Sequence, residues 1–212
     1  MLHLLIGTDW TRNRDAILAR LADNVHTRRE GRILMVPELI SHETERALCR
    51  FAGDTASRYA EVLSFTRLAR RAAEQAGSSA MECLDSGGRV VAMAAARQLA
   101  SKLKAYAAVE TKPEFLTELI DAVDEFKRCC ITAQDLKVAA AQTEGSLAQK
   151  LEELSLLMES YDALCSQGKR DPRDQMTWLL EQLEESDYAQ THVFYIDGFP
   201  DYTRQHLEIL EH

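Results

Sequence analysis

Four short apolar runs set the strongest limit on what this chain can fold into. Each run is five residues long and rich in leucine, β-branched or aromatic side chains, which is typical of a buried strand. Helix-like stretches separate the first three runs, and the fourth comes near the end of the chain. The runs are residues 2–6, 32–36, 61–65 and 192–196. This alternation predicts an α/β fold, a parallel sheet covered by helices.

The middle of the chain, from about residue 80 to residue 188, has helical periodicity throughout. Pro113 is placed to start one helix. Thr132, with Asp135 three residues later, is placed to cap another. Because the fourth apolar run needs the first three as strand partners, we expect an α/β domain interrupted by an all-helical insertion.

One apolar stripe in this helical part has two interpretations. Between residues 145 and 166, apolar residues recur at spacings of four and three, which favours packing on another helix. That helix belongs either to the insertion itself or to a partner protein. The stripe consists of Leu147, Leu151, Leu154, Met158, Tyr161 and Cys165.

Charge and cysteine content narrow the classes of function. A net charge of −9 argues against electrostatic adhesion of the whole surface to nucleic acid. Residues 57–71 nevertheless carry four arginines and one acid, either as a solvated helix face or as a binding surface. No run is long enough to span a membrane, and no signal peptide is visible. Five cysteines without a CxxC pair predict reduced thiols in a cytoplasmic protein and no metal site.

The first apolar run ends at Gly7, and a helix-like pattern follows, which is the layout of a phosphate-binding loop. A working loop, GxxxxGK[ST], needs a second glycine, a lysine for the outer phosphates and a hydroxyl for magnesium. Arginine, asparagine and arginine stand at these three positions. The site is therefore either an ordinary strand-to-helix turn or a degenerate nucleotide site without the groups for hydrolysis. The residues of this candidate site are Gly7, Thr8, Thr11, Arg12, Asn13 and Arg14.

Asp197 directly follows the fourth apolar run. P-loop NTPases place the aspartate that holds magnesium at this point. In a hydrolytic helicase the next residue is a glutamate that polarises the attacking water, and here it is Gly198. We therefore add Asp197 to the degenerate nucleotide site; the alternative is a tight turn in which its carboxylate accepts backbone hydrogen bonds.

Four longer segments together carry a resemblance to a known family. They are "ILMVPELISHETERALC", "AEVLSFTRLARRAAE", "KLEELSLLMESYDAL" and "YIDGFPDYTRQHLEIL". In this order they resemble the N-terminal region of the B subunit of the bacterial ATP-dependent helicase/deoxyribonuclease, the AddB/RexB family, which is similar to UvrD-like superfamily 1 helicases. The resemblance implies a RecA-like, P-loop NTPase-type lobe (1A-type) at residues 1–78 and 168–212. It implies a helical insertion (1B-type) at residues 79–167.

The resemblance also implies where DNA binds. The segments "VPE" and "LSFTR" fall where such helicases contact single-stranded DNA. Hydroxyls and an arginine there are suited to phosphate, and an aromatic ring is suited to a base. The expected DNA-binding residues are Pro37, Ser64, Phe65, Thr66 and Arg67. Core packing is the alternative for Phe65, and plain solvation is the alternative for Arg67.

The leading hypothesis is a fragment without catalytic residues that serves as a DNA-binding and assembly scaffold in double-strand break processing and homologous recombination. The partners implied are single-stranded or unwinding DNA and the helicase/nuclease partner, which is the A subunit of the same complex. The family's nuclease metal and iron–sulfur cluster are implied to lie beyond residue 212. One alternative is a lobe that binds Mg-ATP through Asp197 with Arg12 or Arg14. The other is a pure protein-interaction module that docks on the partner helicase.

Overall fold

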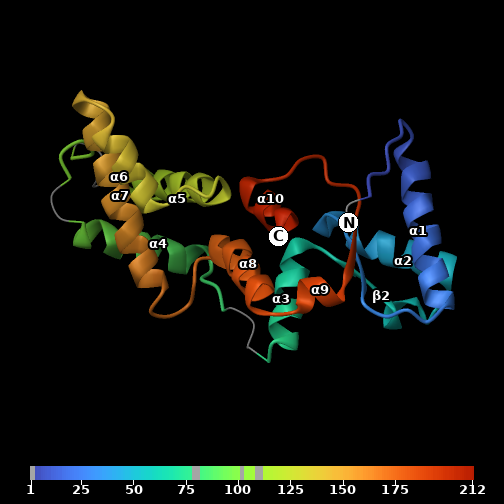
Figure 1. Ribbon diagram of the computed structural model, residues 1–212. Helices are drawn as coiled ribbons and strands as arrows, with labels where there is room; N and C mark the ends of the chain where they lie inside the picture. The colour runs from blue at the N-terminus through green and yellow to red at the C-terminus, as the bar shows by residue number, and fades with distance from the viewer. Residues whose placement is uncertain (1–2, 78–81, 101–102, 108–111) are drawn as a thin grey trace. The chain divides into compact units, whose positions relative to one another are not determined.

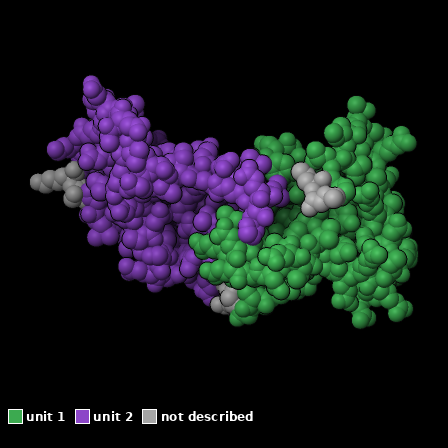
Figure 2. Space-filling view, viewed as in Figure 1, with its two compact units in different colours: residues 1–79, 179–202 green, residues 80–178, 203–212 purple. Residues whose placement is uncertain are grey.

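The computed structural model describes residues 3–77, 82–100, 103–107 and 112–212. The chain separates into two compact units, shown in different colours in Figure 2. Unit 1 consists of Met1–Ser79 and Leu179–Tyr202, and unit 2 consists of Ala80–Trp178 and Thr203–His212. No helix within the described ranges is long and apolar enough to cross a membrane.

Unit 1 is built on a parallel sheet of three strands, β1 (Arg32–Met35), β2 (Ala60–Leu63) and β3 (Val193–Ile196). The strand order is β2-β1-β3, with β1 parallel to both neighbours and its Met35 opposite Leu63 and Ile196. Since β1 lies between the other two and is covered on its faces, its apolar side chains are at most 1% exposed. The prediction of an α/β fold with a parallel sheet is confirmed.

Within unit 1, helices precede β1 and β3 and follow β1 and β2. The two long helices α1 and α2 pack on one another and lie side by side in Figure 1, and their apolar faces share one core with β1 and β2. The helical elements are α1 (Trp10–His26), the 3-10 turn Glu38–Ile40, α2 (Ser41–Ala52), the 3-10 turn Ala56–Arg58, α3 (Phe65–Gln75) and α9 (Tyr188–Thr191).

The sequence predicts a strand at residues 2–6, and this prediction is wrong for residues 3–6, the part that the structure describes. Residues 3–6 take part in no strand pairing, and Leu4 and Ile6 are 75% and 89% exposed. A strand forms only where a neighbouring strand satisfies its backbone groups. Within the described residues, the edge strand β3 is paired only with β1, so no strand lies beside this run.

Unit 2 is helical, and its local signals agree with the sequence. Pro113 is the first residue of α5, and Thr132 and Asp135 form a complete capping box at the start of α6, as predicted. The helices are α4 (Ser86–Leu99), α5 (Pro113–Arg128), α6 (Ala133–Ala141), α7 (Gly145–Cys165), the 3-10 turn Pro172–Asp174 and α10 (Arg204–Glu211). A further helix, α8 (Gln175–Glu185), crosses the boundary between the units.

The apolar stripe of α7 belongs to the core of unit 2. Met158, Tyr161 and Cys165 are at most 3% exposed in a cluster that also includes side chains from α4, α5 and α6. Only Leu147, near the start of the stripe, is largely exposed, at 54%. The packing partner of the stripe is therefore within the insertion, which favours the internal-core interpretation.

Residues 203–212, which the sequence interpretation assigns to the α/β lobe, cluster with unit 2. The helix α10 contacts α5 there. The Gln205 side chain donates a hydrogen bond to the carbonyl of Arg173 at 3.1 Å, and the thiol of Cys130 lies 3.2 Å from a carboxylate oxygen of Glu208. Because of these tertiary contacts, residues 203–212 belong to unit 2 and not to the unit that contains β3.

A buried network of charges connects the elements of unit 2. The guanidinium of Arg89, on α4, forms ion pairs with Asp124 of α5 and with Asp171, and all three side chains are at most 10% exposed. Burial alone would lower the pKa of Arg89, but its hydrogen bonds to Asp124 and Tyr161 and the charge of Asp171 outweigh burial and raise it. The network keeps buried charges paired, which is what makes them tolerable in a protein interior.

Candidate functional site

The candidate residues of unit 1 lie where the three parallel strands end. In open α/β sheets, ligands bind outside the carboxyl ends of the strands. We call this region the carboxyl edge; it comprises the loops that begin at Val36, Ser64 and Asp197, after β1, β2 and β3. Arg14, on the first turns of α1, reaches this edge from the candidate phosphate loop.

The structure brings Arg14 and Asp197 together. The Nε atom of Arg14 donates a hydrogen bond to Oδ2 of Asp197 at 2.5 Å, and the two side chains are only 17% and 13% exposed. The ring of Trp10 lies 5.1 Å from the guanidinium carbon and covers it from one side. Arg14 thus places a positive charge directly beside the carboxylate of Asp197.

A carboxylate of the chain itself caps the N-terminus of α1. Asp9 is the N-cap residue, and its Oδ1 accepts hydrogen bonds from the backbone N–H groups of Thr11 at 3.0 Å and Arg12 at 3.2 Å. Free N–H groups at a helix N-terminus are what attract phosphate. With Asp9 in place, a negative charge from the chain itself meets these donors.

The rest of the candidate phosphate loop folds closely on itself. A Cβ added at Gly7 would lie 2.7 Å from Oδ1 of Asn13, the residue at the lysine position of the loop. Thr8, Thr11 and Arg12 are exposed. The asparagine side chain therefore lies against the loop backbone.

Gly198 lies close to the Arg14–Asp197 contact. Its backbone has a φ of +79°, and a Cβ at this position would lie 3.0 Å from both Nη2 of Arg14 and Cδ1 of Ile40. A residue with a side chain would meet both backbone strain and crowding here. The backbone and the surroundings of position 198 therefore favour glycine.

Ser64 caps α3 and is itself covered. It is 4% exposed, and its Oγ accepts a hydrogen bond from the backbone N–H of Arg67 at 3.3 Å. The same hydroxyl donates to the carboxylate of Glu38, which follows β1 in the "VPE" segment. Both hydrogen-bonding functions of the hydroxyl are therefore engaged within the chain.

Arg67 forms an ion pair across two helices. Its Nη1 lies 3.0 Å from Oε1 of Glu45 on α2, and the two side chains are 32% and 37% exposed. Among the other expected DNA-binding residues, Thr66 is exposed and Pro37 is half-buried. The structure places Pro37, Ser64, Thr66 and Arg67 at one edge, and it places two glutamates beside them that sequence reasoning missed.

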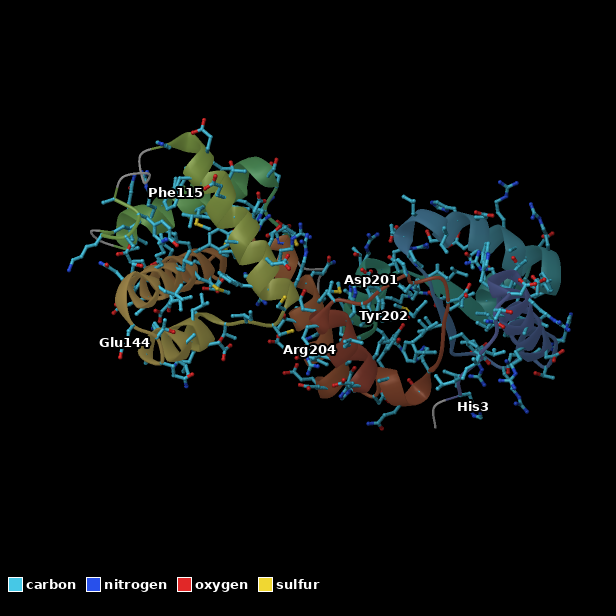
Figure 3. The ribbon with its side chains drawn as sticks, turned by 90° about the horizontal axis from the view of Figure 1, so that it is seen from above. His3, Phe115, Glu144, Asp201, Tyr202 and Arg204 are labelled. Carbon is cyan, nitrogen blue, oxygen red and sulfur yellow. The ribbon has the colours of Figure 1, made fainter. Side chains whose placement is uncertain are left out.

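Phe65 packs into an aromatic cluster. It is 5% exposed, and its ring meets that of Phe199 edge to face, with 5.4 Å between centroids. Phe199 in turn contacts Tyr202, which follows β3 and is labelled in Figure 3. Partial burial and the charge of Asp197 raise the pKa of Tyr202. The burial of Phe65 fits the core-packing interpretation that the sequence left open.

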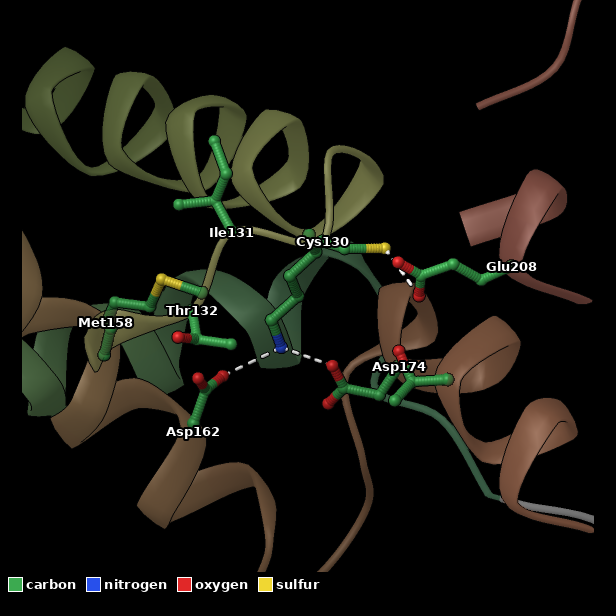
Figure 4. A pocket seen from close by; sticks show the side chains of 10 residues that line it. Cys130, Ile131, Thr132, Met158, Asp162, Asp174 and Glu208 are labelled. Atoms are coloured by element: carbon green, nitrogen blue, oxygen red, sulfur yellow. Dashed lines mark hydrogen bonds and ion pairs between the residues drawn. The ribbon is translucent and has the colours of Figure 1, made fainter. Parts of the chain in front are cut away.

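A separate pocket of about 390 Å³ lies in unit 2 (Figure 4). The ammonium of Lys127 lies in its wall, 2.8 Å from Asp162 and 2.5 Å from Asp174. At the other side, burial and the hydrogen bond to Glu208 raise the pKa of Cys130 to about 11. Over the described parts of the chain, no group of three or more histidine, cysteine and acidic side chains is placed to hold a metal ion.

Comparison with known proteins gives one consistent result. Residues 4–212 match the family model described as "ADDB, N-terminal". A relative from Thermoanaerobacter sp. (strain X514) is 34% identical over 182 residues, which is 84% of this chain and 16% of the relative. A relative from Listeria innocua is 24% identical over 211 residues, which is 99% of this chain and 18% of the relative.

Both relatives are named as the B subunit of an ATP-dependent helicase/deoxyribonuclease, as is one from Clostridium tetani that is 29% identical over 84% of this chain. The chain spans only 16–18% of the length of these curated relatives. The family match, by contrast, covers nearly all of the chain. The chain therefore belongs to the AddB N-terminal family.

Proposed function

We propose that this chain is the N-terminal RecA-like lobe, with its helical insertion, of a helicase–nuclease component that processes broken DNA ends in recombinational repair. Family membership and the printed names of the relatives support this role. The lobe binds single-stranded DNA and docks on a partner protein of the same complex, but it does not hydrolyse nucleotide. The Arg14–Asp197 ion pair is the observation that carries the last point.

A nucleotide bound as in a P-loop NTPase would need two places that this chain fills with its own side chains. Magnesium would need the carboxylate of Asp197, which Arg14 already neutralises in a largely buried pair. Phosphate would need the N–H groups at the start of α1, from which Asp9 already accepts hydrogen bonds. Opening either contact would leave a charge or a helix end without its partner, so binding of nucleotide is opposed at both places.

The carboxyl edge is the proposed DNA surface. Thr66 offers a hydroxyl group at an exposed position. Arg67 offers a planar guanidinium, which can bind a phosphate through two N–H groups as it binds a carboxylate. Such contacts position a nucleic acid backbone without reading its sequence. The proposed role is therefore to hold the strand rather than to select it.

The test is fluorescence anisotropy of a labelled single-stranded oligonucleotide at low and moderate salt, with and without ATP and magnesium. We expect saturable binding that weakens with salt and does not respond to ATP. Arg67→Ala should weaken it by about 3–10-fold and lower the salt slope by about 1.

Arg20→Ala is the matched control, because it removes the same charge from an exposed position of unit 1. Arg20 lies about 15 Å further along α1 from Trp10, given the rise of a helix, so we expect little change. Equal losses in the two variants would contradict a DNA surface at the carboxyl edge. Binding that requires ATP and magnesium would favour the alternative of a nucleotide-binding lobe.

A further inference from the structure

Four groups of unit 1 that could bind an anion are in contact with carboxylates of the chain itself. At four places a donor group or a positive charge that suits a phosphate is met by an acidic side chain of the chain itself. The four contacts are Asp9 with the first turn of α1, Asp197 with Arg14, Glu38 with Ser64, and Glu45 with Arg67.

The four contacts differ in how easily an external anion can replace the carboxylate. The pair of Arg14 and Asp197 is at most 17% exposed, whereas the side chains of Arg67 and Glu45 are 32% and 37% exposed. An ion pair in contact with water contributes little net free energy, because water solvates the separated charges almost as well. The contact of Glu45 is therefore one that an incoming anion can replace.

Glu38 also lies where it can give way. It is exposed, and it starts the short 3-10 turn Glu38–Ile40, whose Leu39 is 97% exposed. Its carboxylate covers the hydroxyl of Ser64 at the N-terminus of α3, where the helix dipole favours a negative group. When Glu38 moves away, this helix end offers the Ser64 hydroxyl to another anion.

We propose that Glu38 and Glu45 are internal competitors of DNA phosphate at the carboxyl edge. Each carboxylate holds a phosphate-binding group in the free protein and is displaced by a phosphodiester when a strand binds, and together the two lower the affinity for DNA. This inference rests on the proposed function, because it assigns regulation to the same surface. The released Glu45 has a second basic neighbour in His42, whose Nδ1 lies 3.5 Å from its other oxygen.

The test compares Glu45→Gln, Glu38→Gln and the double variant with the unchanged chain in the anisotropy titration. Glu45→Gln should tighten binding by about 3–5-fold with little change in the salt slope, because Arg67 then reaches the phosphate without first losing a carboxylate partner. Glu38→Gln should tighten binding by about 2–3-fold, and the double variant should exceed either single one. Thermal unfolding shows whether each variant remains folded.

Glu43→Gln is the matched control. Glu43 is exposed on the same helix two residues from Glu45, so its side chain points about 200° away around the helix. Removing its charge should change affinity by less than about 1.5-fold if the gain depends on position rather than on net charge. Adding Arg67→Ala to Glu45→Gln should abolish the gain, since the competed group is then absent.

The outcomes separate the two proposals. Binding by the unchanged chain that depends on Arg67, with equal affinities for Glu45→Gln and Glu43→Gln, would overturn the competition and leave the proposed function in place. No binding by the unchanged chain, with binding by Glu45→Gln, would support both. No binding by any folded variant would overturn both.

Discussion

Arg14 and Asp197, which are 183 positions apart in the sequence, meet through a hydrogen-bonded ion pair of 2.5 Å. The contact ties the first turns of α1 to the end of β3. Both side chains are largely buried, so neither charge is well solvated by water. The carboxylate of Asp197 thus has a positive charge of the chain itself beside it.

The pair should be coupled energetically. Arg14→Met and Asp197→Asn should each lower the free energy of unfolding by about 1–3 kcal/mol, because each leaves the other partner buried without its counter-charge. The double variant should lose less than the sum, with a coupling energy of about 1–2 kcal/mol. Urea unfolding of the four proteins measures this, and strictly additive losses would show that the contact carries no energy.

A substitution at Gly198 should destabilise the protein more than the same substitution at Gly77, a glycine of similar φ with open space around it. Gly77 has a φ of +71° with no atom of the described residues within 4 Å of an added Cβ, whereas Gly198 has a φ of +79° with Arg14 and Ile40 at 3.0 Å. Gly77→Ala should cost about 1–2 kcal/mol through backbone strain alone. Gly198→Ala should cost about 1–3 kcal/mol more through crowding. Equal costs in denaturant unfolding would refute the close contact.

Arg89 should be among the most sensitive positions of unit 2. Arg89→Ala leaves Asp124 and Asp171 buried without their main cation, which should cost about 3–5 kcal/mol. Lys137→Ala breaks a pair with Glu159 whose side chains are 40% and 56% exposed, and it should cost at most about 1 kcal/mol. Chemical denaturation monitored by circular dichroism compares them. A small loss for Arg89→Ala would mean that solvent reaches the network.

Unit 2 should lose stability at high pH through Lys127. Burial alone would lower the pKa of Lys127, but the charges of Asp174 and Asp162 outweigh burial and raise the pKa above its ordinary value of 10.5. Since the folded pKa is the higher one, this stabilisation is fully present below pH 10.5 and is lost as the pH rises through the folded value.

Neighbouring groups act in the same direction. Burial raises the pKa of Cys165 to about 11, and this contribution too is lost as the pH rises. Lys127→Met should therefore reduce the slope of stability against pH above about pH 10 without removing it. Unfolding free energies measured at several pH values give the slopes. Identical slopes for the two proteins would contradict a charged, paired Lys127.

Local patterns of the sequence predicted the parallel sheet with β1, β2 and β3, the start of α5 at Pro113 and the cap of α6 at Thr132. These features depend on hydrophobic period and capping groups within a few residues, which are visible in the sequence. The run at residues 3–6 has the same composition as a strand but is exposed. Its state depends on a neighbouring strand, which composition cannot reveal.

The sequence yields candidate positions for a site, but it does not reveal the contacts that these residues make. Motif spacing pointed to Arg14 and Asp197, yet nothing local shows that the one neutralises the other. Glu38 and Glu45 belong to an ordinary turn and an ordinary helix. Only the folded chain brings Glu38 to Ser64 and Glu45 to Arg67. Such pairings are tertiary, so a single sequence carries no signal for them.

Isothermal titration calorimetry of the chain with Mg-ATP tests the central claim most directly, since the claim is that Arg14 and Asp9 fill the nucleotide site. We expect no saturable heat at nucleotide concentrations up to about 1 mM, the weak end of usual enzyme–substrate affinities. Saturable, magnesium-dependent binding that Asp197→Asn abolishes would contradict the account, because it would show that Asp197 is free to hold a metal ion.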